Sequence, residues 1–487
     1  MCYHLVMNTQ KNTQTPADTP STACLADVDV AVIGGGVVGC AVARRMSLEG
    51  ASVVLIEKAA DILDGASKGN SAILHTGFDA PPDSLEHQCV RRGYEEYLTI
   101  CKKMNLPVRP TGAMVTAWTQ EEEDRFEAIL AKGKKNGIED LRLLSRKEIL
   151  DREPAMAGHV RAAILVPGES IVDPWSAPLA YLKQSVMNGG QALFNARVIG
   201  GEFDGKRWTL ETVRGQVKAG LVINAAGLYG DRVEADVRGS SFFTIKPRKG
   251  QFVVFDKAAS KLLSSIVLPV PTARTKGIVL FPTIFGNLVV GPTAEEQESR
   301  SNASVDRAIL KELQAQAIAK IPGLKDMPVT TTYAGIRPAT EESPYRVAHD
   351  PDQNWITLGG IRSTGLTGAL GIARHTAELA RECGLSFTAL ESPKTPTMPN
   401  LAQDLPRDFN TPGYEEIVCH CEMVTQREIQ AAMEGELPAG SLSGLKRRTR
   451  ATMGRCQGFY CSARLAELTR NQFASPLGME IKGGDHE

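Results

Sequence analysis

Residues 28–58 read VDVAVIGGGVVGCAVARRMSLEGASVVLIEK. An apolar run (28–33) leads into a glycine turn, a segment with helical spacing follows (37–48), and a second apolar run ends in an acid (53–57). This order predicts a strand, a helix and a second strand parallel to the first. Such a unit implies a parallel sheet with helices on its faces, and hence an α/β fold.

The turn contains three glycines, Gly34, Gly36 and Gly39, in the spacing G-x-G-x-x-G. The first permits a tight turn, the second lets the backbone approach a pyrophosphate, and the third lets the helix pack close to the strand. Glu57 ends the next strand, where an acid can bind an adenosine ribose hydroxyl. Small residues also favour plain helix–sheet packing, but the whole context predicts a dinucleotide site. NAD and FAD share this pattern, so the loop does not choose between them.

The composition narrows the class of protein. The chain has 487 residues, which suggests two or three domains. Its 55 Lys and Arg against 56 Asp and Glu argue against a nucleic-acid partner. Residues 1–26 are polar and lack the features of an export signal, so we expect a flexible tail and a cytosolic protein, with at most peripheral association with the inner face of the membrane.

Several motifs downstream occur in a recognisable order. They are GASKGNSAILHTGF (65–78), VINAAG (222–227), PRKGQF (247–252), YAGIRPATEESPY (333–345) and GGIRSTGLTGALGIA (359–373). With the first glycine loop, this series resembles the flavoenzyme superfamily of D-amino-acid oxidase and the FAD-linked glycerol-3-phosphate dehydrogenases. The NS-x-x-x-H-x-G segment at 70–77 is most similar to the L-2-hydroxyglutarate oxidase branch. The resemblance implies FAD as the cofactor.

Cofactor-binding positions follow from the motifs and the resemblance. VINAAG reads as a buried strand that ends in small residues, and GGIRSTGLTG reads as a strand, a turn and a helix start whose N–H groups could meet an anion. Tight packing is the structural alternative for both. The expected FAD-binding residues are Gly34, Gly36, Gly39, Glu57, Ser71, Ala226, Gly227, Gly360, Gly365, Leu366 and Thr367.

Four cysteines near the C-terminus form two close pairs, Cys419-x-Cys421 and Cys456-x4-Cys461. Zinc sites usually show C-x2-C spacing, so zinc remains an alternative that the spacing fits poorly. The pattern resembles the 2Fe-2S module of bacterioferritin-associated ferredoxins, and more closely the version appended to anaerobic glycerol-3-phosphate dehydrogenases. The resemblance implies a 2Fe-2S cluster held by the four thiolates.

The expected architecture is therefore a Rossmann-like FAD-binding domain, an inserted and mostly antiparallel α+β substrate domain, and a small helical iron–sulfur domain. Five prolines between 393 and 412 favour an extended linker before the last domain. The predicted division assigns 27–110, 160–240 and 335–386 to the FAD domain, 111–159 and 241–334 to the substrate domain, 387–412 to the linker and 413–470 to the cluster domain.

Two residues are the candidates for the chemistry. His75 could accept the hydroxyl proton near neutral pH, or it could instead contact the flavin or the backbone. Arg337 matches the segment that presents a carboxylate-binding arginine in relatives, and a structural ion pair with Glu341 or Glu342 is its alternative.

We therefore expect an FAD-dependent dehydrogenase that oxidises a small anionic hydroxy compound, either a 2-hydroxy acid such as L-2-hydroxyglutarate or glycerol 3-phosphate. Electrons would pass from the flavin through the cluster to a second redox subunit or a quinone. Two alternatives remain open. One is the flavin subunit of an amino- or imino-acid dehydrogenase, and the other is an electron-relay flavoprotein without a substrate.

Overall fold

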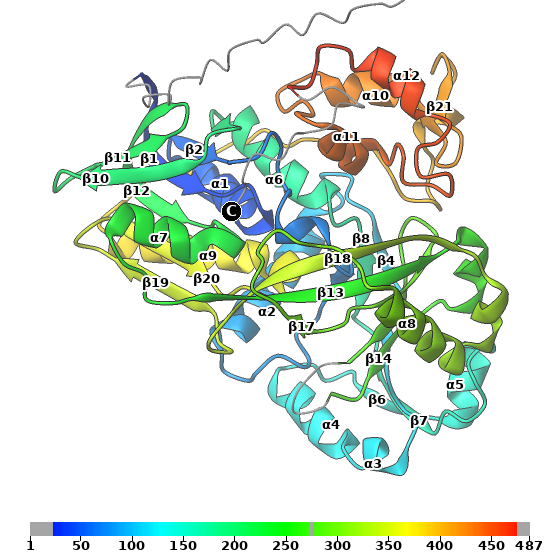
Figure 1. Cartoon of the computed structure of the whole chain (residues 1–487). Helices are drawn as coiled ribbons and strands as arrows, with labels where there is room; N and C mark the ends of the chain where they lie inside the picture. The colour runs from blue at the N-terminus through cyan, green and yellow to red at the C-terminus, as the bar shows by residue number, and fades with distance from the viewer. Residues whose placement is uncertain (1–22, 272–276, 475–487) are drawn as a thin grey trace, which may run out of the picture.

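The computed structural model describes residues 23–271 and 277–474. A mixed eight-stranded sheet forms the first domain (Figure 1). Strand β1 (Cys24–Ile33) lies between β2 (Val53–Ile56) and β12 (Gly215–Asn224) and runs parallel to both. Parallel pairs extend the sheet to β9 (Gln191–Leu193) and β20 (Trp355–Gly359), and β10 (Val198–Phe203), β11 (Trp208–Thr212) and β19 (Arg346–Asp350) add antiparallel edges. The βαβ unit predicted from residues 28–58 is present.

Helices cover both faces of this sheet. The helices α1 (Val37–Leu48), α2 (Leu85–Ile100), α6 (Ser176–Met187) and α9 (Gly365–Glu382) share one apolar core, to which Cys40, Tyr97, Leu182 and Leu370 contribute fully buried side chains. Helix α7 (Gly230–Arg238) packs on the other face through Val237. Near-complete burial of β2 explains why its sequence is an unbroken apolar run rather than an alternating one.

A nine-stranded, mostly antiparallel sheet forms the second domain. Its strands are β5 (Ala113–Ala117), β6 (Arg142–Ser145), β7 (Ala162–Val166), β13 (Ile245–Phe255), β14 (Ile266–Pro269), β15 (Val279–Pro282), β16 (Leu288–Gly291), β17 (Glu295–Glu296) and β18 (Val329–Thr340). The helices of this part are α3 (Gln120–Glu123), α4 (Phe126–Lys135), α5 (Arg146–Arg152) and α8 (Arg307–Lys320). A small sheet of β3 (Ile73–Leu74), β8 (Ser170–Val172) and β4 (Val108–Pro110) completes the main body.

The sheets place some segments differently from the predicted division. Strand β7 pairs with β5 and β6, although residues from 160 onward were assigned to the FAD domain. The whole of β18 pairs with β13, including the residues after 335. Short apolar runs fit either sheet, so only the pairing partner distinguishes them. Strand β1 begins at Cys24, within the predicted tail, whose residues 1–22 lie outside the described part of the chain.

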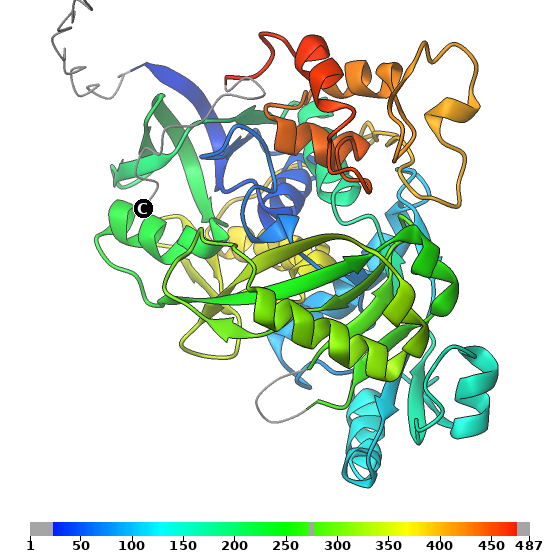
Figure 2. The ribbon, with the colours of Figure 1, turned by 45° about the vertical axis from the view of Figure 1, so that its right-hand side comes forward.

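The C-terminal elements lie together above α6, orange to red in Figures 1 and 2. They are β21 (Ile417–Cys419), β22 (Val424–Thr425), α10 (Gln426–Met433), α11 (Leu442–Thr449) and α12 (Ser462–Leu468), and they share a core of their own. The preceding segment, 387–412, has one short 3-10 turn (Asp408–Asn410) and otherwise runs without helix or strand, yet it buries Met398, Leu401 and Ala402 against the first two domains. No helix in the described ranges is both long and apolar enough to cross a membrane.

Candidate functional site

The glycine loop between β1 and α1 leaves no room for side chains. Gly34 has a φ of +110°, and a Cβ there would lie 2.6 Å from the Ala225 carbonyl oxygen. A Cβ on Gly39 would lie 1.9 Å from the Gly34 carbonyl oxygen, so the helix packs directly on the turn. Gly36 is the N-cap residue of α1 and has no side chain to cover the first N–H groups of the helix. This cradle fits a dinucleotide pyrophosphate, as the sequence predicts.

Glu57 lies at the end of β2, beside the same loop. Its Oε2 accepts a hydrogen bond from Gly35 N (2.6 Å), and its Oε1 accepts one from Ala59 N (2.8 Å). The side chain is buried, and this burial raises the pKa of the carboxyl above its usual range. A buried acid at this strand end fits a ribose-binding role, and its carboxylate already bridges two backbone N–H groups of the loop and the following segment.

The segment 65–76 lies between the glycine loop and α9. Val37 N, at the start of α1, donates to Ser67 Oγ (3.1 Å), and His75 N donates to Thr367 Oγ1 (3.0 Å) in the first turn of α9. Ser71 lies half-buried in the same segment. The structure thus brings three of the predicted regions together: the first loop, the NS-x-x-x-H-x-G segment and the N-terminus of α9.

The remaining predicted cofactor residues lie at the ends of neighbouring strands. Ala226 and Gly227 follow β12, where Ala226 N donates to Asn224 Oδ1 (3.2 Å) and Gly227 has a φ of +56°. Gly360 follows β20 with a φ of +68°, and Gly365 and Leu366 begin α9. Parallel strands β1, β12 and β20 end at one edge of the sheet, which is where ligands bind in open α/β sheets.

His75 has a carboxylate partner that the sequence did not reveal. Its Nδ1 lies 2.8 Å from Glu169 Oε2, and the Glu169 side chain is fully buried while the His75 side chain is about a quarter exposed. Thr76 holds the other carboxylate oxygen through its N–H (2.7 Å) and its hydroxyl (2.9 Å). An ionised carboxylate only accepts hydrogen bonds, so it fixes the proton on Nδ1 and makes Nε2 the acceptor nitrogen of the ring. A lone acid in the run ILVPGESIV gave no sequence signal for this contact.

One face of β18 is turned towards the segment 65–71. Tyr333 Oη donates to the Asn70 carbonyl oxygen (2.9 Å), and a Cβ on Gly335 would lie 2.3 Å from the Gly69 carbonyl oxygen. Since alternate residues of a strand share a face, Arg337 lies on this face too. A Cβ on Gly250 of the paired strand β13 would collide with Arg337 Nη2, so that glycine makes space for the guanidinium.

Arg337 is not engaged by the acids that its sequence suggested. Glu341 and Glu342 both pair with Arg346, at 3.4 and 2.5 Å, and Arg337 Nη2 instead donates to the Thr293 carbonyl oxygen (2.6 Å). Among the described residues no carboxylate lies within ion-pair distance of Arg337. Burial, and next the nearby Arg248, lower the pKa of Arg337 to about 10, so the guanidinium still carries its charge at neutral pH. Glu295 and Glu296 act on this charge only from a distance, so the half-buried guanidinium can still bind an anionic ligand.

The four C-terminal cysteines meet in pairs. The side chains of Cys421 and Cys456 lie beside each other, and so do those of Cys419 and Cys461. Backbone N–H groups, foremost that of Tyr460, lower the pKa of Cys456. In the described part of the chain no three His, Cys, Asp or Glu side chains come together in a way that could hold a single metal ion. Two pairs of thiols fit a binuclear cluster, in which each iron takes two protein ligands.

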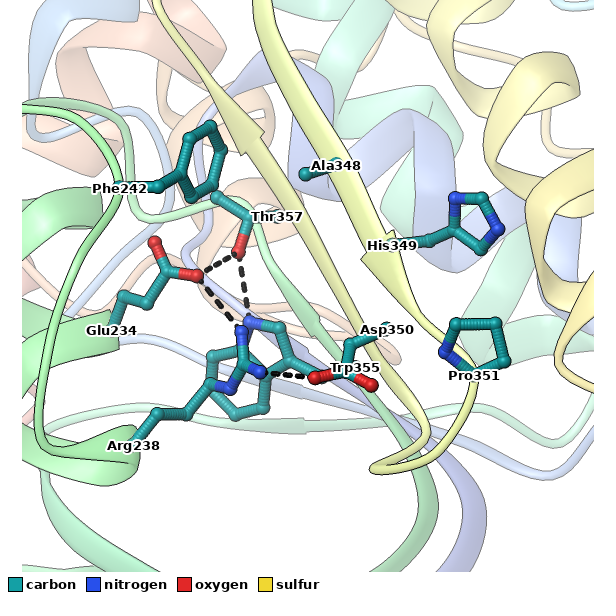
Figure 3. Close-up of a pocket in the computed structure, with 9 residues that line it drawn as sticks. All are labelled: Glu234, Arg238, Phe242, Ala348, His349, Asp350, Pro351, Trp355 and Thr357. Carbon is teal, nitrogen blue, oxygen red and sulfur yellow. Dashed lines mark hydrogen bonds and ion pairs between the residues drawn. The ribbon is translucent and has the colours of Figure 1, made fainter.

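The first domain also has a cavity of about 240 Å³ that is separate from the candidate site (Figure 3). It is bounded by α7, β19 and β20, and its charged side chains are engaged with one another: Arg238 contacts Glu234 (3.2 Å) and Asp350, and Thr357 Oγ1 donates to Glu234 (3.0 Å). None of the candidate residues lines this cavity. We therefore do not assign the substrate to it.

Comparison with known proteins separates the main body of the chain from the C-terminal domain, as the structure does. Residues 29–379 match the DAO family, described as FAD dependent oxidoreductase, and residues 417–470 match the BFD-like 2Fe-2S binding domain. A glycerol 3-phosphate dehydrogenase of Caloramator mitchellensis is 29% identical over 469 residues, which cover 94% of this chain and 97% of that protein. A glycerol 3-phosphate oxidase of Mycoplasma pneumoniae is 32% identical, covering 72% of this chain and 94% of that protein.

Two further relatives bear on substrate and fold. An L-2-hydroxyglutarate dehydrogenase of Indibacter alkaliphilus is 30% identical, covering 55% of this chain and 68% of that protein. The solved structure of dithionite-reduced L-alpha-glycerophosphate oxidase from Mycoplasma pneumoniae, with FAD bound, superposes with a TM-score of 0.71 at 27% identity. That match covers 77% of this chain and all of the other chain.

Proposed function

The chain belongs to the DAO family of FAD-dependent oxidoreductases, and on that premise we propose that it is a dehydrogenase of glycerol 3-phosphate. It is an FAD enzyme with a C-terminal 2Fe-2S domain, as the sequence predicted. The dehydrogenase of Caloramator mitchellensis aligns along nearly the whole chain, whereas the 2-hydroxyglutarate enzyme covers 55% of it. Glycerol 3-phosphate is also a small anion that carries an oxidisable hydroxyl.

The observation that carries this proposal is the positively charged Arg337, which lies half-buried on the face of β18 that meets the segment 65–71. A guanidinium presents a fork of N–H donors that matches two oxygens of a phosphate or a carboxylate. We assign Arg337 to the substrate's anionic group. The Thr293 carbonyl oxygen, at 2.6 Å, orients the guanidinium without cancelling its charge.

We assign His75 as the base. Oxidation of a C–H beside a hydroxyl requires a group that takes the hydroxyl proton, and FAD when bound supplies the acceptor for the hydride. Glu169 holds the proton on His75 Nδ1, so Nε2 can accept the substrate's proton. The same carboxylate then stabilises the imidazolium that results, since the two charges lie in contact and the Glu169 side chain is fully buried. Glu169 is a positioning residue in this scheme.

The cofactor residues named from the sequence are part of the proposal. We assign the loop of Gly34, Gly36 and Gly39 to the FAD pyrophosphate, Glu57 to its ribose, and Cys419, Cys421, Cys456 and Cys461 to the cluster. A 2Fe-2S cluster accepts single electrons, so the redox partner is a second redox protein or a quinone. We place the enzyme in the cytosol, or peripherally at the inner face of the membrane.

An anaerobic titration of the purified protein tests the substrate. Glycerol 3-phosphate should bleach the flavin absorbance at a lower concentration than L-2-hydroxyglutarate, D-amino acids or imino acids. L-2-hydroxyglutarate is the second candidate, because the NS-x-x-x-H-x-G segment resembles that branch and one such dehydrogenase is 30% identical. Preferential bleaching by the hydroxy acid would replace the proposed substrate, and bleaching by amino acids alone would overturn the role given to His75 in taking a hydroxyl proton.

A further inference from the structure

The segment that follows β2, residues 57–63, is tied to the glycine loop at both of its ends. Glu57 Oε2 accepts from Gly35 N (2.6 Å), and Leu63 N donates to the carbonyl oxygen of the same Gly35 (2.9 Å). The side chain of Leu63 is buried in the core of the first domain. The conformation of this segment and that of the phosphate loop are therefore linked by hydrogen bonds.

The same segment forms one of the docking surfaces of the cluster domain. Asp61 is 2% exposed, and its two carboxylate oxygens accept from both Nη atoms of Arg448, at 2.7 and 2.9 Å. Gly440 N donates to Asp61 Oδ2 (3.0 Å), and Arg447 Nη2 donates to the Ile62 carbonyl oxygen (2.7 Å). Removing or displacing one partner of such a buried, bidentate pair leaves the other charge buried without a counter-charge, which strongly destabilises the docked state.

The fit across this contact is close enough to require glycines. A Cβ on Gly440 would lie 1.8 Å from the Ala60 carbonyl oxygen, and one on Gly444 would lie 1.6 Å from Asp61 Oδ2. Neither glycine has a positive φ, so backbone conformation does not call for glycine at these positions. The two glycines let helix α11 and the turn before it lie directly on residues 60–61.

We propose that FAD binding and docking of the cluster domain are thermodynamically coupled through residues 57–63. FAD orders the loop and Glu57, which holds Asp61 in place for Arg448, and the docked domain in turn favours the loop conformation that binds FAD. Coupling of this kind is reciprocal, so each event strengthens the other by the same factor. The inference rests on the proposed assignment of Gly34–Gly39 and Glu57 to FAD.

Hydrogen–deuterium exchange of the full-length protein, with and without FAD, tests whether FAD strengthens docking of the cluster domain. The peptide that contains Gly440 reports directly, because the Gly440 N–H is bonded to Asp61. Removing FAD should speed its exchange, while visible circular dichroism of the cluster stays unchanged. Equal exchange in both states would overturn the proposal, and this comparison needs no variant and no substrate. It therefore stands apart from any failure of the glycerol 3-phosphate assignment.

Variants test the reverse direction, from the cluster domain to FAD. Gly440→Ala, in the cluster domain, introduces a Cβ that clashes with the Ala60 carbonyl oxygen. Asp61→Asn, in the first domain, weakens the pair with Arg448. Each should raise the FAD dissociation constant about tenfold, measured by flavin fluorescence. The control is Asp64→Asn, at the position that follows this segment, since Asp64 contacts Lys68 at the surface (3.3 Å). FAD affinity unchanged in Gly440→Ala would refute the coupling, and so would an equal loss in the Asp64 control.

Discussion

Glu169 is the residue whose substitution most directly tests the catalytic site. In Glu169→Gln the side chain keeps its shape, but one oxygen becomes an NH2 group. Two donors of Thr76, at 2.7 and 2.9 Å, hold the amide oxygen where Oε1 now lies. The NH2 group then faces His75 Nδ1, which must accept a hydrogen bond. The ring proton moves to Nε2, and Nε2 can no longer take the substrate's proton.

The size of the effect on the rate follows from this change of tautomer in His75. A positioned general base contributes about 10²- to 10⁴-fold to a rate, and the variant loses that contribution while the substrate and its anion-binding residue stay in place. We expect flavin reduction by glycerol 3-phosphate to slow by that factor, with little change in the concentration that half-saturates it. The free energy of unfolding should fall by only about 1–2 kcal/mol, because the amide remains hydrogen-bonded on both sides.

Anaerobic stopped-flow absorbance measures the reduction rate directly. Thr76→Val is the matched control, since it removes one donor to Glu169 and leaves the contact with His75 intact. That variant should lose about 1 kcal/mol of stability and reduce its flavin at close to the wild-type rate. Reduction at the wild-type rate in Glu169→Gln would refute the assignment of His75 as a base whose tautomer Glu169 sets.

Three further substitutions test other parts of the site. Arg337→Lys keeps the charge but loses the fork of donors, so the KM for glycerol 3-phosphate should rise about 10- to 100-fold, whereas Arg248→Lys, on the exposed pair with Glu296, should leave it unchanged. Cys456→Ser should abolish the cluster's absorbance and slow reoxidation by the acceptor while single-turnover flavin reduction survives; equal loss of both would contradict the ligand assignment. Gly335→Ala places a Cβ 2.3 Å from the Gly69 carbonyl oxygen, so it should cost about 1–3 kcal/mol in a denaturant titration, and an unchanged midpoint would exclude this close approach.

Local sequence patterns predicted the parts of the molecule that are themselves local. The βαβ unit at 28–58 combines hydrophobic period, glycine spacing and a terminal acid within 31 residues, and together these signals indicate one local structure. The two cysteine motifs at 419–421 and 456–461 are equally short, but the structure sets cysteines of different motifs side by side, Cys419 with Cys461 and Cys421 with Cys456, which the spacing within each motif did not indicate.

Contacts between distant segments could not be predicted in this way. Glu169 lies 94 residues from His75, and nothing in its neighbourhood distinguishes it from a solvated acid. Arg448 lies 387 residues from Asp61, within a basic run that composition describes equally well as a solvated face. The same limit affected the domain boundaries, since the apolar run of β7 carries no information about the sheet that it joins.

The ion pairs between the cluster domain and the rest of the protein differ in exposure, so they should differ in their sensitivity to ionic strength. Arg448 and Asp61 are 5% and 2% exposed, so dissolved counterions have little access to them. Arg455, which binds Asp256 of the second domain at the other edge, is 69% exposed and open to screening. Concentrated salt should therefore weaken the pair of Arg455 with Asp256 well before the pair of Arg448 with Asp61.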